Sequence, residues 1–216
     1  MRSHNGIVLL SLLLCVLYVT PGFAQFGQRQ GQRNGPGNLN ISPADRQLYQ
    51  AAFDGDMDGL KAAMQAGANV NSKGRGDFSP LIAAARNGHL DVVKYLVEHG
   101  ADVDDKDNSR DKTALLAAAF RLHPDIVQYL AEHGADINAQ AINGFTPLHD
   151  AAFVGDVATV KYLVDKGARL DLKNKHGQTA LECAIQGSKM APAHGRTTAT
   201  PADYKEVEDY LRAHMK

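Results

Sequence analysis

The stretch that decides the fold runs from Gly144 to Gly177 and reads GFTPLHDAAFVGDVATVKYLVDKGARLDLKNKHG. Thr146 followed by Pro147 predicts a helix start, because a threonine side chain caps free backbone N–H groups and proline tolerates the first helical position. A turn at Gly155 separates this helix from a second one. The apolar residues of the second helix share one face and are Val157, Val160, Leu163 and Val164. The stretch therefore predicts two antiparallel helices followed by a polar turn.

The same unit recurs along the chain at an almost constant interval. The helix-opening slot is occupied in turn by Ser79, Thr113, Thr146 and Thr179. The glycine that closes the second helix recurs independently as Gly67, Gly100, Gly134 and Gly167. Two unrelated markers that keep the same spacing indicate a repeat architecture.

A period of about 33 residues in which Thr-Pro-Leu-His opens a copy resembles the ankyrin repeat. The segments that carry the resemblance are Thr146 to His149, Ser79 to Leu81, Asn87 to Val93, Gly100 to Asp104 and Gly134 to Asn138. The resemblance implies an all-α repeat solenoid of about five repeats, in which helix pairs are joined by β-hairpin-like turns. It also implies a protein that binds other proteins through its concave face and hairpin tips, without a cofactor.

The composition fits a thin stack of helices. The chain has 216 residues, 44% of them hydrophobic, and a formal net charge of −1, so no charge bias points to nucleic acid or to a membrane surface. Tryptophan is absent and aromatic residues make up 6% of the chain. Such a composition suits an alanine-rich solenoid better than one large central core.

The N-terminal segment before Ser42 is expected to lie outside the repeats. Arg2 precedes an uncharged apolar run from Ile7 to Val19, and small residues stand before position 25, as in a secretory signal peptide over residues 1–24. The run is too short for an ordinary membrane span. Residues 25–41 are rich in Gly, Gln and Asn and predict a flexible linker. Cleavage would remove Cys15 and leave Cys183 as the only cysteine, most simply a buried and inert one.

Residues 42–216 are expected to form one ankyrin-repeat domain. The predicted repeats span residues 42–76, 77–110, 111–143, 144–176 and 177–216. In the last repeat, residues 187–201 have the Gly, Pro and Thr content of an exposed loop and predict an insertion between its two helices. The apolar columns of the second helices are expected to hold the stack together, so a polar residue at Val127 should cost several kcal/mol.

Two columns of surface slots are the candidate protein-binding site. The slots that follow the paired alanines of each first helix hold Phe53, Arg86, Phe120 and Phe153, and the slots before each helix-opening residue hold Phe78, Lys112, Phe145 and Gln178. In the family these positions lie on the concave side. Exposed aromatic residues in a row are typical of a protein-binding groove. In the alternative interpretation, each phenylalanine packs on the neighbouring helix and only thickens the core.

The sequence contains none of the common catalytic motifs, so we expect neither an enzyme nor a cofactor. Nine histidines raise the question of a metal. His99 and His133 precede helix-ending glycines, and His149 fills the structural histidine slot of the family, so no metal site is expected. A weaker alternative places a metal near the C-terminal insertion, where Cys183 and the three histidines His176, His194 and His214 could meet.

The sequence thus favours an exported, non-catalytic module that binds another protein in the periplasm or outside the cell. No nucleic acid partner and no stable membrane anchor after signal cleavage are expected. Exported bacterial relatives of the family suggest a narrower alternative, a partner that protects or neutralises an enzyme or a toxin. A self-associating structural protein is the remaining alternative.

Overall fold

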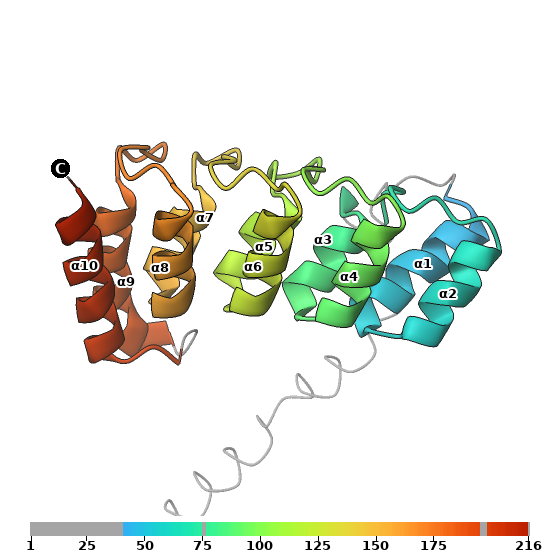
Figure 1. The fold of residues 1–216 in the computed structure, drawn as a ribbon, viewed down its shortest axis with the longest axis horizontal. Coiled ribbons are helices and arrows are strands. Elements are labelled where there is room, and N and C mark those ends of the chain that lie inside the picture. Colours follow the sequence, from blue (N-terminus) through green and yellow to red (C-terminus); the bar gives the residue numbers. More distant parts are fainter. Residues whose placement is uncertain (1–40, 75–76, 195–197, 216) are drawn as a thin grey trace, which may run out of the picture. The chain divides into compact units, whose positions relative to one another are not determined.

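The computed structural model describes residues 41–74, 77–194 and 198–215. These residues form ten α-helices and no strand, arranged as consecutive helix pairs (Figure 1). The prediction of an all-α solenoid of about five repeats is confirmed. The predicted signal peptide and all but the last residue of the predicted linker lie outside the described residues. Among the described helices, none combines the length and the apolar composition needed to cross a membrane.

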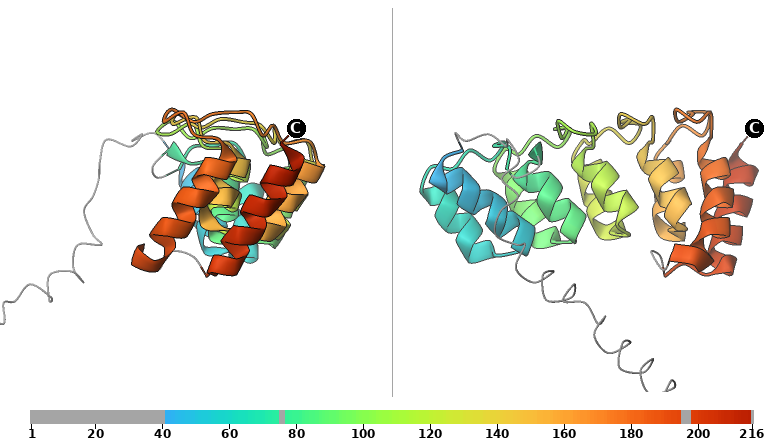
Figure 2. Two further views of the ribbon diagram at one scale, coloured as in Figure 1. Left: turned by 90° about the vertical axis from the view of Figure 1, so that its left-hand side faces the viewer. Right: turned by 180° about the vertical axis from the view of Figure 1, so that it is seen from behind.

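Each pair consists of a first helix and a second helix. The first helices are α1 (Pro43–Asp54), α3 (Pro80–Asn87), α5 (Ala114–Phe120), α7 (Pro147–Val154) and α9 (Ala180–His194). The second helices are α2 (Met57–Gln65), α4 (Leu90–Glu98), α6 (Pro124–Glu132), α8 (Val157–Asp165) and α10 (Pro201–His214). Within the described unit, the first helices form one layer and the second helices the other, with the long turns gathered at one end (Figure 2).

The helix starts follow from side-chain caps. The hydroxyl oxygens of Ser79, Thr113 and Thr146 each accept a hydrogen bond from the backbone N–H three residues further on. Such a cap satisfies one of the N–H groups that a helix leaves free at its first turn. At the other end of α7, Gly155 adopts a φ of 74°, a left-handed conformation that glycine reaches without a steric cost. The two predicted boundaries of α7 are therefore those of the structure.

The core is a continuous row of small and branched side chains between the two layers. The innermost columns of the second helices have no exposed surface, and they consist of Leu60, Val93, Val127, Val160, Ala63, Leu96, Leu130 and Leu163. A third predicted column is less well covered, because Pro124 is exposed and Met57, Leu90 and Val157 are half-buried at the first residue of their helices. Consecutive first helices pack against each other more closely than consecutive second helices do. This alanine-lined inner layer is what brings the slot residues of neighbouring repeats together.

The long turns are joined to each other by side-chain amides and carboxylates. Oδ1 of Asn71 accepts a hydrogen bond from the N–H of Asp102 at 2.9 Å, and Oδ1 of Asn138 accepts one from the N–H of Arg169 at 2.9 Å. An ion pair between Lys73 and Asp105 links two consecutive turns. Because every such bond crosses from one repeat to the next, the turns keep a fixed spacing along the solenoid.

The prediction of a loop over residues 187–201 is wrong over its first half, because α9 continues as a helix to His194. Gly187 suggested a loop but has another role. A Cβ atom at this position would lie 2.1 Å from the carbonyl oxygen of Phe153 and 2.9 Å from the ring of Tyr204. Glycine therefore allows α9 to approach α7 and α10 closely. Met190 belongs to the helical continuation and lies on the side of α9 that faces α7.

Candidate functional site

None of the eight predicted contact residues is sealed inside the core. Phe53 is 42% exposed, and the other seven are half-buried, which leaves part of each side chain in contact with solvent. They divide into two groups along the inner layer. The first group consists of Phe53, Phe78 and Arg86, and the second consists of Lys112, Phe120, Phe145, Phe153 and Gln178.

In the first group, Arg86 covers the ring of Phe78, whereas Phe53 remains exposed. The guanidinium carbon of Arg86 lies 5.5 Å from the centre of the Phe78 ring, within the range of a cation–π contact. Asn87 donates a hydrogen bond of 2.7 Å from Nδ2 to the backbone carbonyl of Phe53. Phe78 also packs against the hydrophobic core. Phe78 therefore contributes partly to the core, as the alternative interpretation of the aromatic slots predicted.

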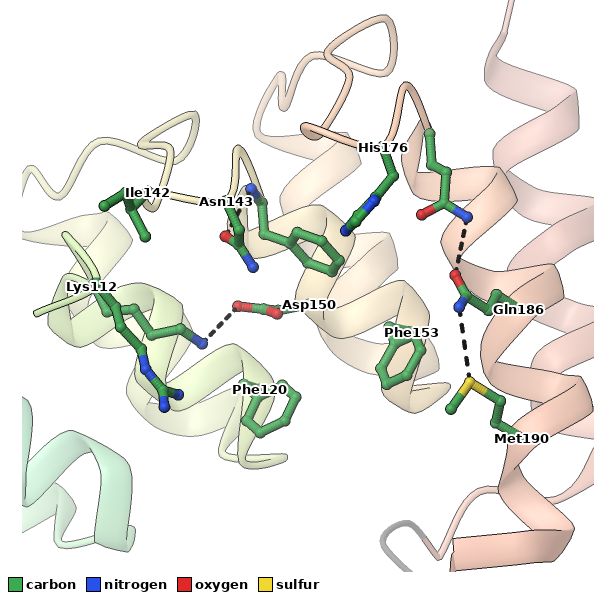
Figure 3. Close-up of a pocket in the computed structure, with 12 residues that line it drawn as sticks. Lys112, Phe120, Ile142, Asn143, Asp150, Phe153, His176, Gln186 and Met190 are labelled. Atoms are coloured by element: carbon green, nitrogen blue, oxygen red, sulfur yellow. Dashed lines mark hydrogen bonds and ion pairs between the residues drawn. The ribbon is translucent and has the colours of Figure 1, made fainter.

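The second group lines a hollow of about 710 Å³ between α5, α7 and α9 (Figure 3). We call this hollow the inner-face pocket. Its lining comprises Arg110, Lys112, Phe120, Ile142, Asn143, Phe145, Asp150, Phe153, His176, Gln178, Gln186 and Met190. Five of the eight predicted contact residues are thus brought together in one place. A volume of this size is in the range of small-ligand and peptide side-chain sites.

A buried carboxylate lies at the floor of the inner-face pocket. Asp150 is 3% exposed, and Oδ2 lies 3.5 Å from Nζ of Lys112. The same oxygen accepts no hydrogen bond of good geometry from the described part of the protein. Burial raises the pKa of Asp150 to about 6, and the positive charge of Lys112 opposes that increase. Asp150 is therefore a carboxyl group that exchanges its proton near neutral pH.

Lys112 extends across the pocket towards Asp150 (Figure 3). Its Nζ lies 4.7 Å from the centre of the Phe120 ring, so the ammonium group contacts both an aromatic ring and a carboxylate. About a fifth of the Lys112 side chain, 20%, remains exposed. The residue thus presents a partly desolvated positive charge to the pocket.

The far wall of the pocket is the inner side of α9. The side-chain amide of Gln178 donates a hydrogen bond of 2.9 Å to Oε1 of Gln186, and Nε2 of Gln186 lies 3.8 Å from the sulfur of Met190. His149 supports this wall from below, since its Nε2 lies 3.0 Å from the backbone carbonyl oxygen of Gln178. His149 is itself buried, and burial lowers its pKa. The structural role expected for this histidine is the one observed.

Cys183 lies on the buried side of α9. It has no exposed surface, and burial raises its pKa to about 12, with the charge of Asp150 as the next contribution. A thiol of this kind is a poor nucleophile and a poor metal ligand at neutral pH. Within the part of the chain that the structure describes, no three His, Cys, Asp or Glu side chains are grouped so that they could hold a metal ion. The side chain of His194, part of the weaker metal alternative, lies outside the described residues.

Sequence reasoning missed several residues of the pocket. It missed Asp150 although one signal was present, since the equivalent positions of the neighbouring repeats hold Ala83, Ala117 and Cys183. A carboxylate among small apolar residues on the buried side of a helix is unusual enough to mark a site. The pocket residues that come from turns have positions that a repeat pattern does not reveal, and these are Arg110, Ile142, Asn143 and His176. Gln186 was missed because α9 was expected to end nearby, and Met190 because its segment was assigned to a loop.

Comparison with known proteins agrees with this geometry. Residues 48–141 match the family described as ankyrin repeats in three copies, and residues 123–164 match the family described as ankyrin repeats in many copies. Together these two matches cover more than half of the chain, and both lie within the solenoid. The chain therefore belongs to the ankyrin-repeat family.

The individual proteins that this chain resembles are of several different kinds. The chain is 31% identical over 151 residues to a mitochondrial disaggregase of Bos taurus, with 69% of this chain and 22% of that protein covered. It is 36% identical over 98 residues to ankyrin repeat domain-containing protein 37 of Bos taurus, with 45% of this chain and 62% of that protein covered. It is also 43% identical over 75 residues to alpha-latrocrustotoxin-Lt1a of Latrodectus tredecimguttatus, covering 34% of this chain and 5% of the toxin. The chain spans less than two thirds of the length of each of these relatives. The similarity is therefore a similarity of the repeats and not of the whole proteins.

Proposed function

We propose that this protein is an exported, non-catalytic module that binds another protein through the inner face and the turn ends of its repeats. One observation carries the proposal. Five half-buried side chains from three successive repeats, Lys112, Phe120, Phe145, Phe153 and Gln178, line one hollow of about 710 Å³ on the inner layer. Partly exposed aromatic side chains that surround a hollow are the usual anchoring points of a protein interface.

The rigidity of the inner layer supports a binding role. The backbones beneath the pocket are fixed by helix caps, by the buried contact between His149 and Gln178, and by the close approach of α9 to α7 at Gly187. A preorganised surface loses little conformational entropy when a partner binds. The site is therefore suited to recognition without a large rearrangement.

The cellular location is the second part of the proposal. We place the protein in the periplasm or outside the cell, because the apolar run from Ile7 to Val19 follows a basic residue and ends near small residues. Cell fractionation and N-terminal sequencing of the recovered protein test this part. Recovery from the cytoplasm with residue 1 or 2 still at the N-terminus would contradict it.

Capture of a partner by the full chain tests the binding role. A C-terminally tagged protein is expressed in its native host, cross-linked and recovered, and the retained protein is identified. The double variant Phe120→Ala/Phe153→Ala should lose at least about 90% of the captured partner, since truncation of anchoring aromatics typically costs about 2 kcal/mol or more each.

A matched control removes aromatic rings from the opposite layer. Tyr95 and Tyr162 are also half-buried but lie on the second helices α4 and α8. The double variant Tyr95→Ala/Tyr162→Ala should retain the partner while losing a similar amount of stability. Equal loss in both variants, or recovery of this chain alone as a higher oligomer, would contradict a partner-binding inner face.

A further inference from the structure

The charges that line the inner-face pocket are not balanced. Arg110 and Lys112 are basic, Asp150 is the single acidic residue of the lining, and His176 is the only other ionisable side chain among the lining residues that the structure describes. Arg110 and His176 are exposed, whereas Asp150 is almost completely buried. An approaching group therefore meets positive charge first.

Lys112 is incompletely paired with Asp150. The distance of 3.5 Å from Nζ to Oδ2 exceeds the roughly 2.7–2.9 Å that is usual for an ammonium–carboxylate hydrogen bond. An ammonium group has three N–H donors, and here one side faces the Phe120 ring at 4.7 Å. Lys112 thus retains hydrogen-bonding capacity towards the pocket.

The buried carboxyl group can be neutralised by a proton when a second negative charge arrives. Asp150 is desolvated, its Oδ2 accepts no hydrogen bond from the described residues, and the group already titrates near neutral pH because burial raises its pKa. A protonated carboxyl group can donate a hydrogen bond to a neighbouring carboxylate, and such pairs sharing one proton are stable when they are buried. Once Asp150 is protonated, its charge no longer compensates that of Lys112.

Part of the remaining lining is apolar. The rings of Phe120 and Phe153 and the side chain of Met190 face the pocket from three successive first helices (Figure 3). The volume of about 710 Å³ gives room for an apolar side chain next to a charged one. The pocket therefore combines a positive group, a protonatable acid and an apolar wall.

Because of this combination, we propose that the inner-face pocket receives an acidic side chain of the partner protein, next to an apolar or aromatic residue of the same segment. The carboxylate pairs with Lys112 and Arg110, and the apolar neighbour packs against Phe120, Phe153 and Met190. Asp150 takes up a proton as the carboxylate arrives. The inference rests on the proposed binding function and adds the chemistry of the bound segment. A basic side chain is the opposite choice, and it would have to approach Asp150 past two positive charges.

Three peptides of equal size test the chemistry. Because the chain contains no tryptophan, the fluorescence anisotropy of Ac-Trp-Glu-NH2, Ac-Trp-Gln-NH2 and Ac-Trp-Lys-NH2 reports on the peptide alone when full-length protein is added. At pH 6 the Glu peptide should bind about five- to tenfold more tightly than the Gln peptide, as expected for one charge-assisted hydrogen bond that remains partly solvated. The Lys peptide should bind most weakly. Equal binding of the Glu and Gln peptides, or preference for the Lys peptide, would overturn the inference.

Variants assign the preference to particular residues. Lys112→Met should abolish most of the discrimination between the Glu and Gln peptides, since only the exposed Arg110 then remains to pair with the carboxylate. Since this change leaves Asp150 buried without a counter-charge, the double variant Lys112→Met/Asp150→Asn provides the same test in a pocket without an unpaired charge. Arg86→Met is the matched control, because Arg86 also covers a phenylalanine ring but lies outside the pocket. Retained preference in both Lys112 variants would contradict the inference.

The pH dependence gives an independent readout. Asp150 is faced by Lys112 and Arg110 from the segment before α5, by His176 from the turn before α9, and by Cys183 on α9, with His149 beside it on α7. Affinity for the Glu peptide should fall by at least about threefold between pH 5.5 and pH 8, since proton uptake by one group is linked to binding. Asp150→Asn should keep the preference and flatten this profile, whereas His176→Gln should leave the slope unchanged. A slope that persists in Asp150→Asn and disappears in His176→Gln would overturn the role given to Asp150.

Failure of this inference is distinguishable from failure of the proposed function. If the Phe120→Ala/Phe153→Ala variant loses a captured partner while the three dipeptides bind equally, the inner face binds protein and the acidic preference is wrong. If neither the partner nor the Glu peptide depends on these residues, both are wrong.

Discussion

The two ends of the inner layer contain the same kinds of residue but form different surfaces. In the first two repeats, Arg86 lies over Phe78, and Phe78 packs on the core, so the aromatic ring is covered by its own neighbour. In the last three repeats, Lys112, Phe120 and Phe153 surround an open hollow. A column of aromatic slots therefore becomes a site only where the adjoining elements leave space for a ligand.

Two features create that space at the C-terminal end. One is Asp150, towards which Lys112 extends, whereas the equivalent position of the second repeat holds Ala83. The other is the continuation of α9, which adds a wall that the shorter first helices lack. The difference between the two ends predicts that substitutions at these two features alter the structure of the C-terminal end alone. Only substitutions in the shared core should destabilise both ends.

The largest effect is expected for Val127→Asp. Val127 has no exposed surface and lies on α6, between the two ends of the solenoid. An uncompensated charge at such a position costs about 3–5 kcal/mol. Because neighbouring repeats stabilise each other, we expect the denaturation midpoint to fall for both ends together, measured by circular dichroism and hydrogen exchange. Val127→Ala should cost less, about 1–3 kcal/mol, and loss of protection confined to one end would show that the ends are independent.

Gly187→Ala should have the next largest effect, limited to the C-terminal end. The added methyl group would meet the backbone carbonyl of Phe153, which cannot move aside as a flexible side chain can. Overpacking of this kind costs about 1–3 kcal/mol. Hydrogen exchange should show lost protection in α9 and α10 with α1 to α4 unchanged.

A control for that variant separates packing from backbone strain. Gly67→Ala introduces a residue at a φ of 83° with no atom within 4 Å of the new methyl group. It should cost about 1 kcal/mol through the left-handed conformation alone. If Gly187→Ala proved no worse than Gly67→Ala, α9 would not be held against α7 by close contact.

Asp150→Asn should change the pH dependence of stability by an amount comparable to the effect of Gly187→Ala. The pKa of Asp150 is raised by burial from 3.8 to about 6, so the folded state binds the proton more tightly than the unfolded state. The contribution of Asp150 to the free energy of unfolding is therefore expected to be highest below pH 4 and to decrease as the pH rises through 6, by up to about 3 kcal/mol. Urea denaturation at pH 4 and pH 8 should show this decrease in the natural protein and a smaller one in Asp150→Asn. Identical pH profiles would contradict a buried, weakly paired carboxyl group.

The solenoid was predictable from the sequence because its evidence is local and repeated. Thr146 caps the start of a helix with its side chain, Pro147 and Gly155 set helix ends by their backbone preferences, and the same residue types recur at other repeats. The slot residues followed from the repeat register, which is why five of them meet at one pocket. The rest depends on contacts between repeats. Gly187 suggested a turn by its type, whereas its role is to allow two helices to approach.

Asp150 shows the same limit for the site. Its burial and its long contact with Lys112 depend on how α5, α7 and α9 pack, and no property of the segment around Asp150 predicts that geometry. What the sequence does contain is an exception, an acidic residue where neighbouring repeats place alanine or cysteine. In a repeat protein, departures from the pattern are thus the best guide to a site, because the regular positions are used for stacking.

The smallest expected effects are the coupling energies of the two cation–π contacts, and they test the difference between the two ends most directly. A double-mutant cycle on Arg86 and Phe78 measures the contact that covers the ring at the N-terminal end, and a cycle on Lys112 and Phe120 measures its counterpart in the pocket. The Arg86–Phe78 distance is 5.5 Å and the Lys112–Phe120 distance is 4.7 Å, and both contacts are partly exposed, so each coupling energy should be about 0.5–1 kcal/mol. Single substitution of Arg86 by Met should leave binding of the Glu peptide unchanged, because that contact only covers an aromatic ring. If Arg86→Met weakened binding as much as Lys112→Met does, the inner layer would act as one continuous basic surface, and the difference between its two ends would have no functional meaning.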